Sequence, residues 1–413
     1  MAYDFRKTLD TVSKGLKIMK NDRSRSGSNP SAGASGRTVV YRRNAGMGGG
    51  FFGKIRSAKR STKIIVAVLA VLLICAAVAI GAVSCIFGKI DFVSDKEMVI
   101  PEDVDSIVLE PEEGEIVSES DTLDDEQMDA INENIAVSQV DDDGLRYEDG
   151  VTNILVLGTD GRRETEGHTR SDVIIIMSIN DNSKKITLSS IMRDTYVAIP
   201  GRRGNDKINA AHAYGGPALA VETVQKAFGI KIDKFVRVNF YSFMDVVDAL
   251  GGVQLDINSG EKRMMNVYIR QINKVNHLDE NDGLINETGE NITVTGKQAM
   301  GYVRVRYVGD GDYERTLRQR RVLEQIIKKA READYLTLLN IVDKVAENVS
   351  TDYSAAEITK LAMNAGDYRD YEISQLRIPV EGSYWGGIYH GIWILDIDFE
   401  KNRQALYDAV FDS

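Results

Sequence analysis

Three short apolar segments lie in the middle of the chain, and each ends in polar or charged residues. They comprise residues 153–158, 173–179 and 186–192. Runs of this length and composition are typical of buried strands. If they form consecutive antiparallel strands, the first ends at the edge where the second begins, and the third returns to that edge. The pattern therefore predicts a meander of three strands.

Charged side chains gather at the shared edge of these predicted strands. Asp160 follows the first segment, Arg170 and Asp172 precede the second, and Arg193 and Asp194 follow the third. Carboxylates are hard oxygen ligands for Mg²⁺, and the planar guanidinium group of Arg suits phosphate oxygens. The edge therefore predicts a metal-assisted phosphate site. A set of surface ion pairs at loop ends is the alternative interpretation.

Helical and strand patterns alternate after the third segment. Apolar residues recur at helical spacing in residues 207–214 and 217–228, and Gly229 marks the end of the second helix. A strand is expected at residues 235–240, then a helix opened by Ser242, then a strand at residues 253–257. Residues 261–292 are polar and predict a long surface excursion. We expect an α/β fold, an αβα sandwich with a central mixed sheet.

Residues 302–307 (YVRVRY) alternate between apolar and basic positions. The alternation predicts a strand with Arg304 and Arg306 on one face. Two like charges side by side repel each other unless an anion or a carboxylate lies between them. An anion site is one interpretation, and an exposed edge strand protected by Arg is the other.

A helix is predicted to begin at Asp312, whose side chain can cap its first turn. Arg315 and Gln319 lie on the same helical stripe as apolar residues further along. We expect this helix to direct Arg315 and Gln319 into a cleft, where its N-terminus adds partial positive charge. Arg320 and Arg321 are expected to be solvated.

Charge is unevenly distributed along the 413 residues, whose formal net charge is −11. Residues 1–63 contain fifteen Lys or Arg against three Asp and predict a disordered, basic arm. Residues 64–88 carry no charge and could cross the roughly 30 Å hydrocarbon core as one transmembrane helix. The positive-inside rule places the arm in the cytoplasm and the rest of the chain outside the cell membrane. A secretory signal peptide would have a shorter basic region and a shorter apolar core.

The predicted outer part begins with residues 89–150, which are rich in Asp and Glu and indicate an acidic extracytoplasmic stalk with a short helix at residues 125–137. Residues 151–413 then form one large domain. The two cysteines, Cys75 and Cys85, fall in the predicted span, so the outer domain has no disulfide. His212 has no second His at metal-ligand spacing and is expected to be structural. The basic arm lacks a recognition pattern, and no nucleic-acid partner is expected.

Six motifs follow one another between residues 153 and 330. They are GTD ending at Asp160, TRSD ending at Asp172, IMRDTYVAIPG from Ile191, NDKINAAHAYGG from Asn205, FVRVNFYSFMDVVDALGGV from Phe235 and GDYERTLRQRR from Gly311. Together they resemble the LytR-CpsA-Psr family, whose layout the arm, the span and the outer domain also fit. Members of that family are bacterial membrane-anchored enzymes that move a glycopolymer from an undecaprenyl diphosphate carrier onto peptidoglycan.

The resemblance implies a role for each matching residue. Asp160 and Asp172 would hold Mg²⁺, with Mn²⁺ as an alternative, on the diphosphate of the carrier. The diphosphate oxygens and head group would be contacted by Arg170, Arg193, Arg304, Arg306, Arg315 and Gln319, and Asp312 belongs to the same late motif. The polyprenyl chain would enter a pocket between the sheet and the helices.

The resemblance also implies the reaction. The C6 hydroxyl of N-acetylmuramic acid would attack the sugar-proximal phosphorus, and undecaprenyl phosphate would leave without a covalent enzyme intermediate. Asp160 or Asp194 could accept the hydroxyl proton, although Asp194 could instead orient Arg193. Two alternatives remain open: a polyprenyl diphosphate-binding regulatory module without transfer activity, and a lipid pyrophosphate hydrolase. The polymer could be teichoic acid, capsule or another wall glycan.

Overall fold

The structure is a computed structural model, and it describes residues 88–93, 104–106, 122–159, 169–306, 308, 312–364 and 366–411. The predicted basic arm lies outside these residues, as does the predicted transmembrane segment apart from Gly88. Both stay predictions. Among the described residues, no helix combines the length and apolar character needed to cross a membrane.

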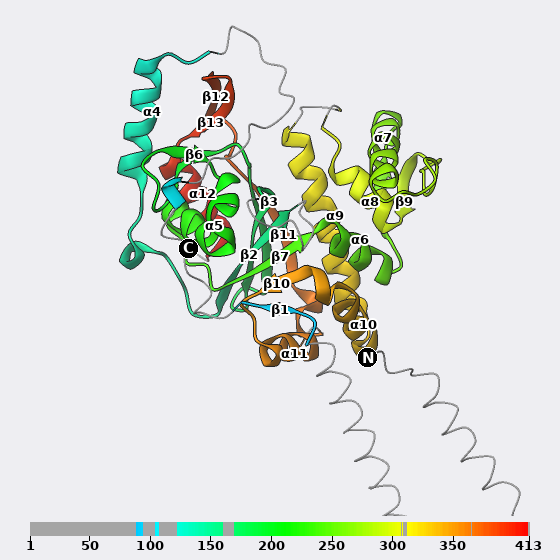
Figure 1. Cartoon of the computed structure of the whole chain (residues 1–413). Helices are drawn as coiled ribbons and strands as arrows, with labels where there is room; N and C mark the ends of the chain where they lie inside the picture. The colour runs from blue at the N-terminus through cyan, green and yellow to red at the C-terminus, as the bar shows by residue number, and fades with distance from the viewer. Residues whose placement is uncertain are drawn as a thin grey trace, which may run out of the picture. The chain divides into compact units, whose positions relative to one another are not determined.

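A seven-stranded mixed sheet forms the centre of the fold, in the order β1-β10-β7-β2-β3-β4-β11 (Figure 1). Its strands are β1 (Asp91–Phe92), β2 (Val151–Thr159), β3 (Ser171–Asn180), β4 (Lys185–Ile191), β7 (Lys234–Asn239), β10 (Val349–Thr351) and β11 (Glu372–Ile378). β2, β3 and β4 form the predicted antiparallel meander. β7 pairs with β2 and β11 pairs with β4 in parallel. The predicted central mixed sheet is therefore confirmed.

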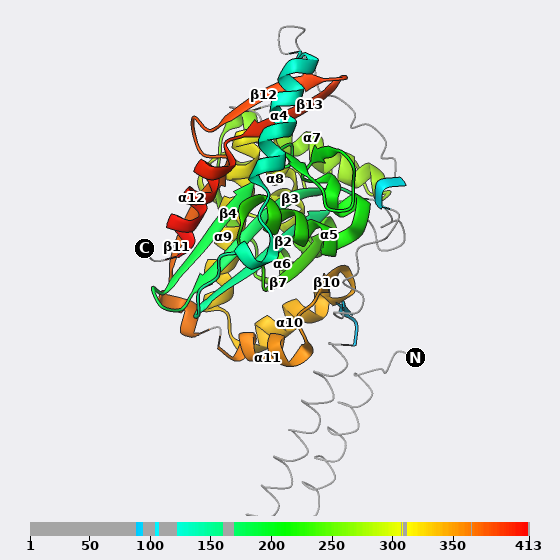
Figure 2. The ribbon, with the colours of Figure 1, turned by 90° about the vertical axis from the view of Figure 1, so that its left-hand side faces the viewer.

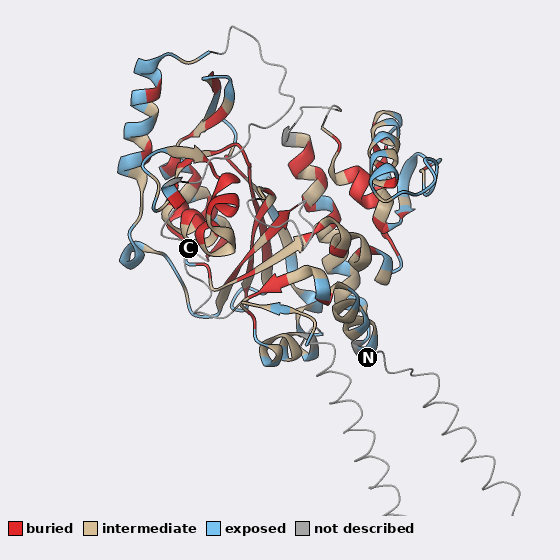
Figure 3. Ribbon diagram, in the orientation of Figure 1, coloured by how far each residue is buried: buried red, intermediate tan, exposed pale blue. Residues whose placement is uncertain are grey.

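Helices cover both faces of this sheet (Figure 2). α5 (Ala210–Phe228) and α12 (Phe399–Val410) pack on one face, where Leu155 and Leu157 of β2 join their apolar side chains in the main core. α9 (Asp312–Glu332) packs on the other face, where Val156 lies in a cluster with Leu323. Neighbouring residues of β2 thus face opposite layers, as the period of a strand requires. Figure 3 shows buried residues along the strands and on the inner sides of these helices.

The remaining elements lie around this sandwich. They are α4 (Asp125–Ser138), β5 (Tyr196–Ala198), β6 (Asn205–Lys207), α6 (Phe240–Ala249), β8 (Val253–Ile257), α7 (Ser259–Val275), β9 (Gly289–Val294), α8 (Gly296–Val303), α10 (Tyr335–Val345), α11 (Ala355–Met363), β12 (Tyr384–Tyr389) and β13 (Ile392–Ile397). β5 with β6, β8 with β9, and β12 with β13 form three separate two-stranded sheets. β8 was expected as a strand, and it pairs with β9 outside the central sheet.

Two predicted helices are joined into α5 across a kink. Gly215 and Gly216 leave the helical conformation, and Gly216 has φ 64° and ψ −160°. A side chain with a Cβ atom rarely adopts this conformation, so Gly is required there. Gly229 ends the helix with φ 61°, as its position in the sequence predicted.

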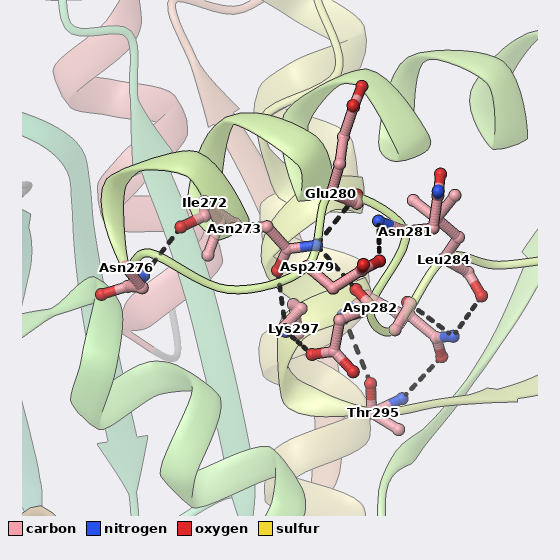
Figure 4. Close-up of polar contacts among 12 residues, drawn as sticks. Ile272, Asn273, Asn276, Asp279, Glu280, Asn281, Asp282, Leu284, Thr295 and Lys297 are labelled. Carbon is pink, nitrogen blue, oxygen red and sulfur yellow. Dashed lines mark hydrogen bonds and ion pairs between the residues drawn. The ribbon is translucent and has the colours of Figure 1, made fainter.

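α6, α7, α8, β8 and β9 share a second apolar core, which includes Met265, Tyr302 and Val322. The loop after α7 is fixed by polar contacts (Figure 4). The amide of the fully buried Asn273 donates to the carbonyl oxygens of Glu280 (3.1 Å) and Asp282 (2.8 Å). Lys297 donates to the Asn273 side chain at 2.9 Å and pairs with Asp282. These bonds tie the start of α8 to the end of α7.

Two details of the predicted elements were wrong. α6 is capped by Asn239, whose side chain accepts from the backbone N–H groups of Tyr241 and Ser242 at 3.0 Å each. Ser242 is instead the third residue of the helix and completes the capping box. The described residues 302–306 do not form the predicted strand, because α8 continues to Val303 and is capped by Arg304.

Parts of the predicted stalk pack against the domain. α4 lies close to its predicted position, and its Met128 and Ile135 are buried. Ile135 and Val104 both belong to the main apolar core, and β1 extends the central sheet. The described parts of the predicted stalk therefore pack against the folded domain.

Candidate functional site

A cavity of about 250 Å³ lies at the edge of the sheet where β3 begins and β4 ends. Its walls come from that edge, from the start of α6, from α7, from the end of α8 and from the first turns of α9. The lining residues are Asp172, Val173, Arg193, Phe240, Tyr268, Val303, Arg304, Arg306, Arg315 and Gln319. Six residues predicted from the sequence therefore meet in one cavity, although they are spread over nearly 150 positions of the chain.

Arg193 connects two carboxylates at the sheet edge. Its side chain is 8% exposed, and its terminal nitrogen donates to Asp172 Oδ1 at 2.7 Å. Arg193 Nε lies 3.6 Å from Asp194 Oδ2, and Asp194 Oδ1 lies 2.9 Å from Lys207 Nζ. Asp194 is buried between these two cations and does not line the cavity. Asp194 therefore contacts Arg193 from the side away from the cavity.

Asp172 is the carboxylate that faces the cavity. Burial raises its pKa, but the charges of Arg193, Arg315 and Arg306 and the hydrogen bond from Arg193 together outweigh burial and lower the pKa below its usual value. Its side chain remains 36% exposed. Asp172 is therefore an ionised carboxylate at neutral pH, partly accessible to a bound cation.

Arg304 and Arg306 reach the cavity from the chain that follows α8. The Arg304 guanidinium lies 4.9 Å from the centre of the Tyr268 ring and 5.6 Å from that of Phe240. Such contacts hold the cation over the aromatic faces. The predicted pairing of the two Arg residues on one strand is replaced by a helix end and the segment after it, which still directs both toward the cavity.

The start of α9 supplies Arg315 and Gln319, as predicted from their helical spacing. Arg315 is 5% exposed. Two neighbours on this helix also proved to be buried. Arg318 is 2% exposed and Arg320 6% exposed, whereas Arg321 is exposed as expected. The expectation for Arg320 was wrong, because this side chain lies against the sheet, where its Nε donates to Gln375 Oε1 at 3.3 Å.

Besides Asp194, three predicted residues are not placed in the cavity. Asp160 lies outside the described residues, one position after the end of β2. Asp312 begins α9, and its side chain is not among those described. Arg170 directly precedes β3 and does not line the cavity; its charge acts on the hydroxyl of Tyr214.

Sequence reasoning assigned no role to three residues of the site. Lys207, in the motif NDKINAAHAYGG, pairs with Asp194. This motif follows the charged motif that contains Asp194, so an ion pair between Lys207 and Asp194 could have been predicted from the sequence. Phe240 and Tyr268 were not identified, because aromatic residues at the start of one helix and within another resemble ordinary core residues.

An apolar pocket of about 110 Å³ adjoins the charged cavity. The two share Val173, Phe240, Val303 and Gln319. The apolar pocket extends between the sheet and the helices α6, α8 and α9, and its other lining residues are Val156, Gly158, Ile175, Val238, Asn239, Phe243, Met300, Leu323 and Ile326. The chemistry of the two compartments, cationic and then apolar, matches that of a ligand with an anionic head and an apolar tail.

The side chains around the cavity can be compared with what a metal needs. Within the described part of the chain, no three His, Cys, Asp or Glu side chains lie together as a metal site. Asp172 is the one described carboxylate that lines the cavity. Mg²⁺ is commonly bound by one or two carboxylates together with substrate phosphates. A single cavity carboxylate therefore fits a metal that arrives with a diphosphate.

Fold and site together define a class of protein. Proteins of this class are αβα sandwiches with an Arg-rich cavity at one edge of the sheet. In this chain the cavity contains four guanidinium groups and one carboxylate, and an apolar pocket adjoins it.

Comparison with known proteins narrows this class. The model of the LytR_cpsA_psr family matches residues 115–406. The polyisoprenyl-teichoic acid–peptidoglycan teichoic acid transferase TagU of Halalkalibacterium halodurans is 35% identical over 242 residues, 58% of this chain and 72% of the relative. The TagU of Bacillus subtilis is 33% identical over 258 residues, 62% of this chain and 74% of the relative. The solved structure of TagT bound to LIIa-WTA is similar with a TM-score of 0.51 and 26% identity, covering 64% of this chain and 93% of TagT. The chain belongs to the LytR-CpsA-Psr family.

Proposed function

We propose that this protein is a phosphotransferase that moves a glycopolymer from an undecaprenyl diphosphate carrier to a peptidoglycan hydroxyl, the C6 hydroxyl of N-acetylmuramic acid. The observation that carries the proposal is the junction of the cationic cavity with the apolar pocket. A polyprenyl diphosphate has an anionic head that complements the cationic cavity, joined to an apolar chain that complements the apolar pocket. The similarity to the TagU transferases and to TagT bound to LIIa-WTA supports the transfer of a polyprenyl-linked polymer.

The cavity would bind the diphosphate through its guanidinium groups. Arg193, Arg306 and Arg315 surround Asp172, and each can donate to phosphate oxygens in a planar, charge-assisted geometry. Gln319 lines both compartments and would mark the junction between head and tail. The side chains of Val173 and Val303 would contact the first part of the prenyl chain.

The reaction is an in-line displacement at the sugar-proximal phosphorus. The acceptor oxygen forms a new bond to this phosphorus, the bond to the bridging oxygen breaks, and undecaprenyl phosphate leaves. Negative charge increases on the phosphoryl oxygens, which fixed Arg side chains stabilise without reorganisation. Because Lys207 and Arg193 hold Asp194, Asp194 would position Arg193. Asp160 would accept the proton only when it is not bound to a metal, because a metal-bound carboxylate is a poor base.

We further propose that Mg²⁺ accompanies the diphosphate, with Mn²⁺ as an alternative. Asp172 would hold the ion together with Asp160 and phosphate oxygens. When bound, the ion would neutralise phosphate charge and polarise the phosphoryl group. The membrane anchor and the peptidoglycan acceptor belong to the same proposal, with the transferred polymer left open.

The transfer can be tested with the full-length chain in detergent. The protein is incubated with MgCl₂, a synthetic undecaprenyl diphosphate oligosaccharide and peptidoglycan oligomers, and products are analysed by mass spectrometry. The proposal predicts an oligosaccharide joined to muramic acid through a phosphodiester. Release of free sugar phosphate with acceptor present would instead identify a hydrolase. Binding without either product would identify a regulatory module.

A further inference from the structure

Arg318 is the largest fully buried side chain among the described residues, yet it lines neither the charged cavity nor the apolar pocket. Its terminal nitrogens donate to the carbonyl oxygens of Val305 at 3.1 Å and Val308 at 2.9 Å. These two carbonyls bracket Arg306 in the chain. We infer that Arg318 is a positioning residue, which holds the segment after α8 so that Arg306 is presented to the substrate diphosphate.

The far side of the Arg318 guanidinium is fixed as well. Its Nε donates to Glu261 Oε1 at 2.9 Å, and Glu261 is 5% exposed. The other oxygen of Glu261 accepts from the backbone N–H of Asn258 at 3.0 Å, which caps α7. Glu314 lies 3.6 Å from Arg318 on the same helix. Arg318 thus connects the start of α7, the start of α9 and the segment that carries Arg306.

This network suits Arg and no other side chain. The planar guanidinium donates in several fixed directions at once, whereas Lys offers one compact ammonium group. A buried ion pair is also a weak source of net stability, because desolvation offsets its attraction. What the network supplies is therefore a fixed backbone. The segment needs it, since it directly follows the end of a helix, and its described residues belong to no strand.

The inference rests on the proposed function for its ligand but can be tested apart from it. The central variant is Arg318→Met combined with Glu261→Gln. It removes both buried charges together, and glutamine at position 261 can still cap α7. The single variant Glu261→Gln is the matched control, because it alters the same pair but keeps both bonds from Arg318 to the carbonyls. Thermal unfolding of each variant shows that the fold is retained.

Affinity for geranylgeranyl diphosphate is measured by calorimetry with the full-length chain in detergent. We expect the double variant to bind roughly tenfold or more weakly, the loss of one charge-assisted contact, and the control to stay within about twofold. Adding the double change to Arg306→Ala should cause no further loss, because Arg318 acts through Arg306. A fully additive loss would mean that Arg318 has only a general structural role and would overturn the inference.

Hydrogen exchange without ligand provides the second readout. The double variant should exchange faster at the amides of Val305 and Arg306, while the exchange of β2 and β3 stays unchanged. Unchanged exchange at these amides overturns the inference whatever the affinities are. If the wild-type chain binds no polyprenyl diphosphate, the proposed function fails, and the exchange result still decides whether Arg318 holds this segment.

Discussion

At the scale of single residues, Arg193 is the centre of the site. It contacts Asp172 inside the cavity and is held from behind by Asp194, which Lys207 neutralises. A cation fixed between two carboxylates keeps one geometry. In the proposed function, Arg193 would exchange its contact with Asp172 for a phosphate oxygen when the substrate binds. Its neighbour Asp194 then remains neutralised by Lys207.

Replacement of Arg193 by Ala should weaken the binding of a polyprenyl diphosphate by about 1.5–3 kcal/mol, roughly ten- to hundredfold, because a charge-assisted hydrogen bond is lost. Transfer should fall at least as far. Arg203→Ala serves as the control, since this side chain is 94% exposed. Equal affinities of wild type and Arg193→Ala in calorimetry would remove Arg193 from the site.

His212 predicts how stability depends on pH. Burial lowers its pKa to about 4, and the charge of Arg237 acts in the same direction, while its hydrogen bond to the carbonyl of Thr169 opposes them. The unfolded chain therefore binds more protons than the folded one between pH 6.5 and pH 4, so the stability gained from neutral His212 is lost as the pH falls. From pH 7 to pH 5 we expect a loss of about 2 kcal/mol in the free energy of unfolding.

Urea denaturation at several pH values measures this loss. His212→Gln should remove most of the slope between pH 7 and pH 5, whatever its stability at pH 7. Asp172 does not contribute in this window, because its pKa lies below its usual value and its effect appears only in stronger acid. A slope that persists in the variant would assign the effect to other groups.

The residues of the site were predicted when their chemistry was visible in a motif, and missed when it depended on packing. Asp172, Arg193 and Arg315 stand in charged motifs and line the cavity. Arg318 and Arg320 lie beside them on α9, and the sequence does not show which face of a long polar helix is covered. The buried face of α9 is determined by its contacts with α7 and β11, and both elements are distant from α9 in the sequence.

At the scale of elements, local periodicity predicted the meander but misassigned residues 302–306. Thr295 caps α8 in a capping box with Gln298, and this signal precedes the alternating residues. α8 therefore begins before the alternating residues and includes the first two of them, Tyr302 and Val303. A strand at this place would also have needed a partner, and β8 already pairs with β9.

The kink in α5 gives a prediction about an element. Gly216→Ala should lower the free energy of unfolding by roughly 1–3 kcal/mol, because φ 64° and ψ −160° are strained for any residue with a Cβ atom. Gly204→Ala is the control, since no atom lies within 4 Å of its added Cβ atom. Denaturant unfolding of both variants provides the comparison. Equal stability would show that α5 can straighten.

At the scale of the whole molecule, the apolar pocket is a product of the sandwich. Its lining residues lie on β2, β3, β7, α6, α8 and α9. No pair of neighbouring sequence motifs contains all of these residues. The family resemblance implied a lipid pocket between the sheet and the helices, but not which residues line it. Those residues are ordinary apolar positions whose exposure is known only after the layers are packed.

Val238→Phe should fill part of this pocket and shorten the lipid that fits. We expect a larger loss of affinity for geranylgeranyl diphosphate than for isopentenyl diphosphate, because Val238 lines the apolar pocket that the longer chain would occupy. Arg193→Ala should weaken the binding of both ligands to the same extent, since Arg193 would contact the head group that they share. If Val238→Phe left the ratio of the two affinities unchanged, the prenyl chain would lie elsewhere.

The most direct measurement is a crystal structure of this chain with geranylgeranyl diphosphate bound. We expect phosphate oxygens within hydrogen-bond distance of Arg193 and Arg306, with the prenyl chain passing Gln319 into the pocket between β3 and α9. A diphosphate bound outside the cavity lined by Asp172, or a prenyl chain outside this pocket, would contradict the proposed function of this site.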